Sequence, residues 1–380
     1  MTTGLIYFDN NATTRLDQAV LTAMLPYFTE LYGNSASQHH FGLELAKIVE
    51  QARADIMYYI GGSDGKIIFT SGATESINIA LKGVAFEASV GKTKIVTCAT
   101  EHQAVLDTCA YLEQIGFEIA FLPVDSMGLV SLAHAEQIID EQTLAVAIML
   151  VNNETGVIQP IHELARLTHR QDALLICDAT QAIGKIPVDV DELNVDILIF
   201  SGHKFHAPKG IGALYLKRGM KLAAHMHGGG HEYGLRSGTL NVAGIVGLSK
   251  ALEIAIKNIE QNTMHIKQKR DLLESKLLSI QGTSLNGHPN LRAPNVSNIS
   301  FPGIDANTFI SEMTYLAVAN GSACTSAVFE PSHVLRAMGI DNQAAFGAIR
   351  FSLSKFNTEA EVEEVVSLID KYLLRVTPIH

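Results

Sequence analysis

The sequence of 380 residues has no tryptophan and four cysteines, and no apolar stretch in it reaches the length of a membrane-spanning helix. The cysteines, Cys98, Cys109, Cys177 and Cys324, are scattered along the chain. This spacing argues against a disulfide framework or a CxxC metal-binding motif and fits a reducing, cytoplasmic location. The first residues lack a basic region followed by an apolar one, so no secretory signal is expected.

Basic residues are also in short supply. The formal net charge is −11, and the sequence contains no long basic block. A surface that binds nucleic acid as its main function is therefore not expected, and neither is a membrane partner. Hydrophobic residues make up 47% of the chain and charged residues 18%, an ordinary composition for a folded domain, and the length predicts one large domain with a smaller one.

Short apolar runs alternate with helical patterns over the first part of the chain. This order predicts a mainly parallel sheet with helices on both faces, which is an α/β fold. The predicted strands cover residues 5–8, 66–70, 94–98, 119–122, 145–151, 174–177, 197–200 and 213–216. The predicted helices include residues 16–31, 43–60, 132–139 and 161–170.

The last third of the chain has a different pattern. A long helix with an apolar face begins near Ile245 and continues, straight or with a bend, towards Ile280, and the domain hinge is expected along it. The segments 296–301, 306–315, 334–338, 348–352 and 359–374 then predict an α+β layer, which the N-terminal strand is expected to join. The expected domains are a large one of residues 15–255 and a small one of residues 1–14 and 256–380.

Polar groups follow two neighbouring predicted strands. Asp178 ends one of them, and Ser201, His203 and Lys204 follow the other. Ligands bind just past the carboxyl ends of parallel strands. A buried lysine near a carboxylate suits pyridoxal phosphate, because the amine can form a Schiff base and the acid can pair with the pyridinium nitrogen. A surface lysine and a capping aspartate are the alternative for either residue alone, but the combination favours the cofactor.

Three further segments bear on such a site. Residues 71–75 lie between a strand and a helix, so they predict either a phosphate site at free helix N–H groups or a simple helix cap. His102 follows another strand, where it can stack on a cofactor ring and carry protons or can serve as a structural histidine. Residues 225–231 resemble a metal-binding tract, but their glycines favour a structural loop, and no metal site is expected.

The chain resembles the cysteine desulfurases of the nitrogenase and iron–sulfur-cluster assembly type, which are class V aminotransferases of the pyridoxal-phosphate fold-type I superfamily. The resemblance runs essentially from end to end, over the motifs DNNATTR, YGN, TSGATES, TEHQAV, VNNETGV, CDATQAIGK, SGHKFHAPKGIGALY, GGGHEYGLRSGTLN, NGSACTSAVFEPSHVLRAMG and IRFSLS. It implies a large domain with a mainly parallel seven-stranded sheet beside a smaller α+β domain, and pyridoxal 5'-phosphate as the cofactor.

The resemblance also implies roles for individual residues. Lys204 binds the cofactor covalently and acts as the catalytic base, Asp178 pairs with the pyridinium nitrogen, and His102 stacks on the ring and takes part in catalysis. Arg350 grips the substrate carboxylate in a planar fork, which lysine does not reproduce. The remaining implied cofactor contacts are Ala73, Thr74, Asn153, Gln181, Ser201 and His203. Substrate contacts also come from Asn34 and Asn153, while Thr239 reaches the phosphate of a neighbouring subunit, which implies a homodimer.

Cys324 lies among small and polar residues, in a composition typical of a surface loop. By resemblance its thiolate attacks the sulfur of L-cysteine, leaving L-alanine and a persulfide that passes to an acceptor protein such as an iron–sulfur scaffold. The other three cysteines are expected to be inert core residues. Three departures from the family pattern are Tyr233 in place of arginine, Ser35 in place of proline, and the triplet Phe-His-Ala at 205–207.

Two alternatives remain open at this point. Another enzyme of the superfamily, such as an aminotransferase or a selenocysteine lyase, would share most of the polar residues, although transamination does not require Cys324. A non-catalytic scaffold that keeps the fold would share the elements but would not bind the cofactor through Lys204.

Overall fold

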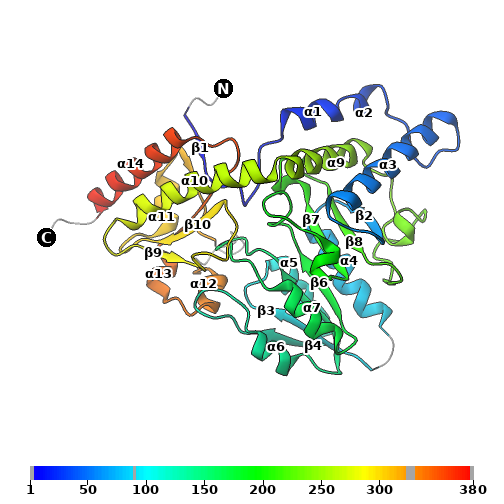
Figure 1. The fold of residues 1–380 in the computed structure, drawn as a ribbon, viewed down its shortest axis with the longest axis horizontal. Coiled ribbons are helices and arrows are strands. Elements are labelled where there is room, and N and C mark those ends of the chain that lie inside the picture. Colours follow the sequence, from blue (N-terminus) through cyan, green and yellow to red (C-terminus); the bar gives the residue numbers. More distant parts are fainter. Residues whose placement is uncertain (1–3, 89–90, 322–329, 377–380) are drawn as a thin grey trace.

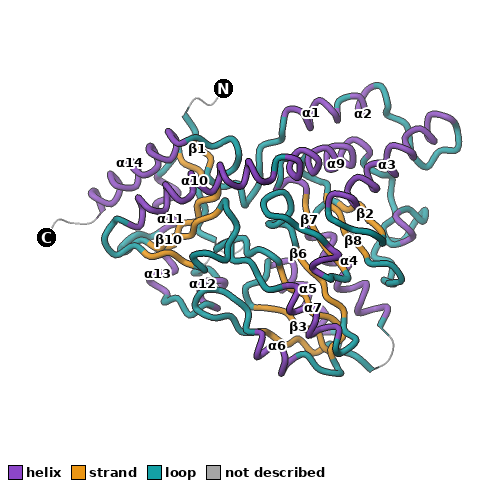
Figure 2. The backbone as a smooth tube through the Cα atoms, viewed as in Figure 1, coloured by secondary structure: helices purple, strands orange, loops and turns teal. Residues whose placement is uncertain are grey.

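The computed structural model describes residues 4–88, 91–321 and 330–376. A large part built on a broad sheet lies beside a smaller part, and helices α9, Val242–Lys257, and α10, Ile259–Leu278, run one after the other across the two (Figure 1). Loops occupy the region between the large sheet and the smaller part (Figure 2). Within the described ranges, no helix combines the length and the apolar character that crossing a bilayer requires.

The large sheet has seven strands in the order β2-β8-β7-β6-β5-β3-β4. Its strand β8 runs antiparallel to β2 and to β7, and the other neighbours are parallel, which confirms the predicted mainly parallel seven-stranded sheet. The strands are β2 Lys66–Thr70, β3 Lys94–Cys98, β4 Glu118–Leu122, β5 Thr143–Met149, β6 Leu174–Asp178, β7 Ile197–Ser201 and β8 Gly212–Leu216.

Side chains that alternate along each strand enter two separate cores. In β7, Leu198 and Phe200 face one core while Ile197 and Ile199 face the other, because successive side chains of a strand point to opposite faces. Helices α1, α3, α6, α7 and α9 cover the first face, and α4 and α5 cover the second. Their bounds are α1 Gln18–Met24, α3 His40–Tyr59, α4 Ala73–Glu87, α5 Gln103–Gln114, α6 Leu132–Ile138 and α7 Ile161–His169. Short helices complete this part, namely α2 Pro26–Thr29, α8 Val190–Leu193, η1 Gly202–Lys204 and η2 Glu232–Gly234.

The smaller part has its own apolar core, which includes Phe301, Phe309 and Phe351. The N-terminal strand β1 pairs in parallel with β11 at the register Ile6 to Leu316, which confirms that the N-terminus joins this layer. The elements are β1 Ile6–Tyr7, β9 Ser284–Asn286, β10 Val296–Ser300, β11 Leu316–Ala317 and β12 Ala348–Ser352, with helices α11 Ala306–Glu312, α12 His333–Ala337, α13 Asn342–Phe346 and α14 Glu359–Val376. The division of domains at residues 255 and 256 stays a prediction.

Three predicted helices end differently in the structure. The predicted helix over 16–31 is wrong, since α1 ends before Leu25 and α2 starts at Pro26. Proline lacks the N–H that would continue the helical hydrogen bonds across this point. The predicted helix over 306–315 ends at Glu312. The long helix from 245 to 280 is interrupted at Asn258, whose ψ of 15° takes the chain out of the helical conformation.

A buried ion pair fastens the segment at 232 to the edge of the large sheet. Glu232 accepts hydrogen bonds from both terminal nitrogens of Arg53 at 3.0 and 2.9 Å, and from the backbone N–H of Phe69 in β2 at 2.6 Å. Because β2 is an edge strand, this carboxylate satisfies a backbone group that has no neighbouring strand to pair with. The ring of Tyr233, one of the departures from the family, lies 5.3 Å from the Arg53 guanidinium.

Replacing Glu232 by alanine is expected to lower the free energy of unfolding by about 3–5 kcal/mol, because it leaves a buried guanidinium whose remaining counter-charge is the exposed carboxylate of Glu50. Urea denaturation followed by circular dichroism suits a chain without tryptophan. The matched control is Glu136→Ala, which removes the exposed pair with Arg170 and should change stability by at most about 1 kcal/mol. Equal effects of the two substitutions would contradict the stabilising role of the Glu232 pair.

Candidate active site

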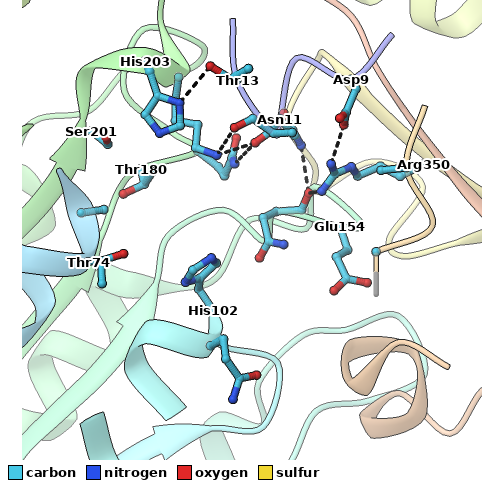
Figure 3. A pocket seen from close by; sticks show the side chains of 18 of the residues that line it. Asp9, Asn11, Thr13, Thr74, His102, Glu154, Thr180, Ser201, His203 and Arg350 are labelled. Carbon is cyan, nitrogen blue, oxygen red and sulfur yellow. Dashed lines mark hydrogen bonds and ion pairs between the residues drawn. The ribbon is translucent and has the colours of Figure 1, made fainter. Parts of the chain in front are cut away.

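A cavity of about 1430 Å³ lies where the parallel strands of the large sheet end, and loops of the smaller part complete its wall. The polar side chains in Figure 3 converge on it from both parts of the chain. Residues following β2, β3, β5, β6 and β7 line the cavity on one side, and residues 305–321 with His333 and Arg350 line it on the other. The strand-end rule therefore places the ligand site here.

The start of helix α4 forms an anion-binding corner of this cavity. Its N-cap is Gly72, and no side chain caps the helix, so the first N–H groups of the helix are available to a ligand. The backbone is crowded at this point, because a Cβ atom on Gly212 would lie 2.7 Å from the Cα of Gly72. Thr74, Ser201 and His203 line the cavity near this corner (Figure 3). Together these groups fit a phosphate.

The acid and the amine that the sequence brings into one site both line the cavity. Asp178 is 8% exposed, and its Oδ1 accepts a hydrogen bond from the N–H of Thr180 at 2.9 Å. The Nζ of Lys204 donates to the main-chain carbonyls of Asn11 at 2.6 Å and Ala12 at 2.8 Å. Burial, and next the positive charge of Arg350, lower the pKa of Lys204 to about 8. This amine is therefore much closer to losing its proton at neutral pH than an exposed lysine.

Two histidines on the wall are both kept from protonation by their surroundings. The Nδ1 of His102 accepts the N–H of Ala104 at 3.1 Å, so the neutral ring carries its hydrogen on Nε2. Burial is the main cause that lowers the pKa of His102. Burial, and then the charge of Lys204, lower the pKa of His203 to about 4, and its Nδ1 lies 3.1 Å from the hydroxyl of Thr13. Both rings are neutral near pH 7.

Arg350 reaches the cavity from strand β12 of the smaller part. One terminal nitrogen donates to the carbonyl of Asn153 at 3.0 Å, and the other pairs with Oδ1 of Asp9 at 2.7 Å. The Arg350 side chain is almost fully buried, at 8% exposure. The Asp9 carboxylate holds the guanidinium in place at the cavity wall and compensates its charge (Figure 3).

Three buried polar atoms on this wall have no hydrogen-bond partner among the described residues: Oδ1 of Asn153, Oγ1 of Thr180 and Nε of Arg350. Each such atom destabilises a fold by about 1–3 kcal/mol. A polar ligand in the cavity would supply the missing hydrogen-bond partners. The donors at α4, the Asp178 carboxylate and the Lys204 amine form a set that fits the phosphate, ring nitrogen and aldehyde of pyridoxal phosphate.

The structure brings most of the predicted site residues together, but not all of them. Those that line the cavity are Ala73, Thr74, His102, Asn153, Asp178, Gln181, Ser201, His203, Lys204 and Arg350. Asn34 and Thr239 are exposed and are not part of its wall. Cys324 lies outside the described residues. The remaining cysteines, Cys98, Cys109 and Cys177, are buried and unpaired.

Asn11 is a central residue of the site that sequence reasoning did not single out. It is 2% exposed and makes hydrogen bonds through its N–H, both amide atoms and its main-chain carbonyl. The partners of these groups are Ser352, Asn153, Lys185, Asn295, Gln181 and Lys204. The repeated Asn-Asn of the N-terminal motif was the available signal, but it says nothing about partners so far away in the sequence.

Comparisons with known proteins agree with this geometry. Residues 6–365 match the model of the family Aminotransferase class-V. The chain is 44% identical over 377 residues to the cysteine desulfurase IscS of Edwardsiella ictaluri, with 98% of this chain and 93% of that protein covered.

Solved structures give the same result. A NifS-like protein superposes with a TM-score of 0.92 at 42% identity, over 97% of this chain and 99% of the other. The structure described as SspA in complex with cysteine superposes with a TM-score of 0.82 at 34% identity, over 93% of this chain and 99% of the other.

Proposed function

This chain belongs to the aminotransferase class-V family, and we propose that it is a cysteine desulfurase. It removes sulfur from L-cysteine, releases L-alanine and holds the sulfur as a persulfide on Cys324. The observation that carries the proposal is the meeting of Asp178, Lys204 and Arg350 at one cavity. An acid for the ring nitrogen, an amine for the aldehyde and a cation for an amino-acid carboxylate are what this reaction requires.

Enzymes of this family depend on pyridoxal 5'-phosphate, which supplies an electron sink for the substrate α-carbon when bound. In this chain Lys204 would bind it covalently, Asp178 would keep its ring nitrogen protonated, and the start of α4 would hold its phosphate. Lys185 donates a hydrogen bond to Oε1 of Gln181 at 2.5 Å. This contact fixes the orientation of the amide, so that its NH₂ group points to the main-chain carbonyl of Asn11.

The residues around Lys204 also suit it to act as a base. With substrate in the cavity, the free amine of Lys204 would move the α-proton of the substrate. An amine with a pKa of about 8 is suited to take up and return a proton near neutral pH. Arg350 holds the substrate carboxylate with its planar guanidinium, which fixes the α-carbon next to the base.

The sulfur is transferred to a thiol of the protein. The carbon–sulfur bond of the substrate breaks, a sulfur–sulfur bond to Cys324 forms, and a proton replaces sulfur on the substrate carbon. Burial raises the pKa of Cys98 to about 11 and that of Cys109 to about 12, and it also raises the pKa of Cys177 well above its ordinary value. These thiols are therefore poor nucleophiles, which leaves the reaction to Cys324.

The proposal extends to a homodimer in the cytoplasm that passes its sulfur to an acceptor such as an iron–sulfur scaffold. Thr239 lies outside its own cavity, as the resemblance implies for a residue that serves the site of a partner subunit, and we assign Asn34, which also lies outside it, to the same role. Large apolar side chains close to Asn34 in the sequence are exposed, with Phe28 at 59% and Tyr32 at 72%. An exposed apolar surface of this kind is typical of a subunit interface.

The direct test is the product balance of the cofactor-loaded protein with L-cysteine. With a thiol reductant present, alanine and sulfide are expected in equal amounts. Without it, alanine should appear in a burst and sulfur should stay on the protein. Formation of 3-mercaptopyruvate with amino transfer to the cofactor would instead show an aminotransferase, and turnover of L-selenocysteine alone would show a selenocysteine lyase. Absence of any turnover would leave the scaffold alternative.

A further inference from the structure

Glu154 is a buried carboxyl group on the cavity wall to which the reaction described above assigns no role. It follows β5 in a tight turn, where the Oδ1 of Asn152 accepts the N–H groups of Glu154 and Thr155, each at 2.9 Å. Its exposure is 1%. Figure 3 shows its side chain at the edge of the site next to Arg350. The turn therefore presents this carboxyl group in one direction, towards the smaller part of the molecule.

The first contact of Glu154 lies just after the segment 322–329. Its Oε2 accepts a hydrogen bond from the hydroxyl of Ser332 at 2.5 Å. The same hydroxyl accepts the N–H groups of Val334 and Leu335 at 3.1 and 3.2 Å, so it is the N-cap of helix α12. Glu154 thereby fixes the point where the chain enters α12.

The second contact lies just before that segment. Gly321 has a φ of +77°, and a Cβ atom built on it would lie 2.2 Å from the same Oε2 of Glu154. The backbone at 321 is therefore packed directly against the carboxyl group. Any side chain there would have to displace the carboxyl group and would also be strained at this φ.

We propose that Glu154 is a positioning residue for Cys324, because one buried carboxyl group fixes the chain on both sides of the segment that carries the thiol. The inference rests on the proposed function, since it gives Glu154 a role only in sulfur transfer to Cys324. It acts through its contacts with Gly321 and Ser332.

The energetics of Glu154 support a role other than stability. Removing a carboxyl group from water is unfavourable unless good partners compensate it. Burial raises the pKa of Glu154 to about 7, although Ser332 and the charge of Arg350 act in the opposite direction. Among the described residues no lysine or arginine donates a hydrogen bond to it. An apolar side chain would fill this space with less loss of folding free energy, but it could not accept the Ser332 hydroxyl.

The test compares Glu154→Ala and Glu154→Gln with the exposed control Glu163→Ala, all as cofactor-loaded full-length protein. We expect the alanine variant to keep its cofactor absorbance and a KM for L-cysteine within about threefold, while kcat and the rate of persulfide formation on Cys324 fall about 10- to 100-fold, as for a displaced reacting group. The glutamine variant should recover to within about threefold of wild type, since its amide oxygen accepts the same hydroxyl. The control Glu163→Ala should have the kcat, KM and rate of persulfide formation of the wild type.

Three results would overturn the inference: persulfide formation at the wild-type rate in Glu154→Ala, a parallel loss of cofactor binding and persulfide, or no recovery with glutamine. If Glu154→Ala does not fold, Gly321→Ala tests the same contact from the other side, because the added methyl group would displace the Glu154 carboxyl group. This variant should have a lower kcat and an unchanged KM. A wild-type kcat in that variant would also reject the inference. Failure of the wild type itself to form persulfide would instead reject the proposed function.

Discussion

Replacement of Lys204 by alanine is expected to remove the yellow absorbance of covalently held cofactor and to lower desulfurase turnover by at least about 10³-fold. The expected loss is large because the variant lacks both the covalent attachment and the base, and general acid–base catalysis alone contributes 10²–10⁴-fold. The chain should still fold, since among the described residues the Nζ of Lys204 donates to two main-chain carbonyls, which water can satisfy at an open cavity. Absorbance of the dialysed protein and alanine release measure the two effects.

The surrounding charges give this prediction a pH dependence. The free amine of Lys204, not its ammonium form, reacts with the aldehyde of the cofactor. Burial and the charge of Arg350 lower the pKa of Lys204 to about 8. The rate of cofactor uptake by the apo-protein should therefore rise with pH and level off above about 8. Lys221→Ala serves as control, because Lys221 is exposed, and it should behave as wild type. A Lys204→Ala protein that still forms a borohydride-reducible adduct and turns over cysteine would contradict the assignment.

Replacement of Cys324 by alanine is expected to leave cofactor absorbance and the spectral response to L-cysteine intact, and to reduce sulfide and persulfide to the level without enzyme. The cavity residues that bind cofactor and carboxylate are untouched, whereas the group that takes the sulfur is gone. Mass spectrometry of the protein after a single addition of L-cysteine, together with sulfide release under reductant, measures this effect.

The control for Cys324→Ala is Cys109→Ala, which removes a thiol from the core beneath α5. That substitution should lower stability by about 1 kcal/mol but leave desulfuration unchanged, because the raised pKa of Cys109 keeps it protonated. Wild-type sulfide production by Cys324→Ala would contradict the persulfide step. Loss of activity in Cys109→Ala at full folding would show that the reacting thiol was misassigned.

The parallel sheet and the strand-end residues could be predicted from sequence because both depend on local patterns. Uninterrupted apolar runs fix the buried strands, and parallel strands place Asp178 and Lys204 at one edge whatever the details of packing. Arg350 is different. No pattern links a residue of β12 to a cavity formed by another sheet, and only the family resemblance suggested it. Its pairing with Asp9 and with the Asn153 carbonyl emerges from the tertiary structure alone.

Other features escaped prediction for equally physical reasons. The break between α1 and α2 depends on a single residue, Pro26, which lies inside the helix predicted over 16–31. The short strands β9 and β11 have too few residues to show an alternating pattern. The contact between Glu154 and the backbone of Gly321 joins positions far apart in sequence. In the sequence, nothing distinguishes Gly321 from the other glycines expected in loops.

The interlocking of the N-terminal turn with strand β12 also sets the order in which this protein is completed on the ribosome. Residues 9–12 are synthesised first, yet Asp9 pairs with Arg350 and the N–H of Asn11 donates to Ser352. Until translation has passed Ser352, the turn that receives the Lys204 amine lacks its contacts with β12. A premature stop codon upstream of β12 therefore removes Arg350 from the cavity wall and leaves the N-terminal turn without its partner strand.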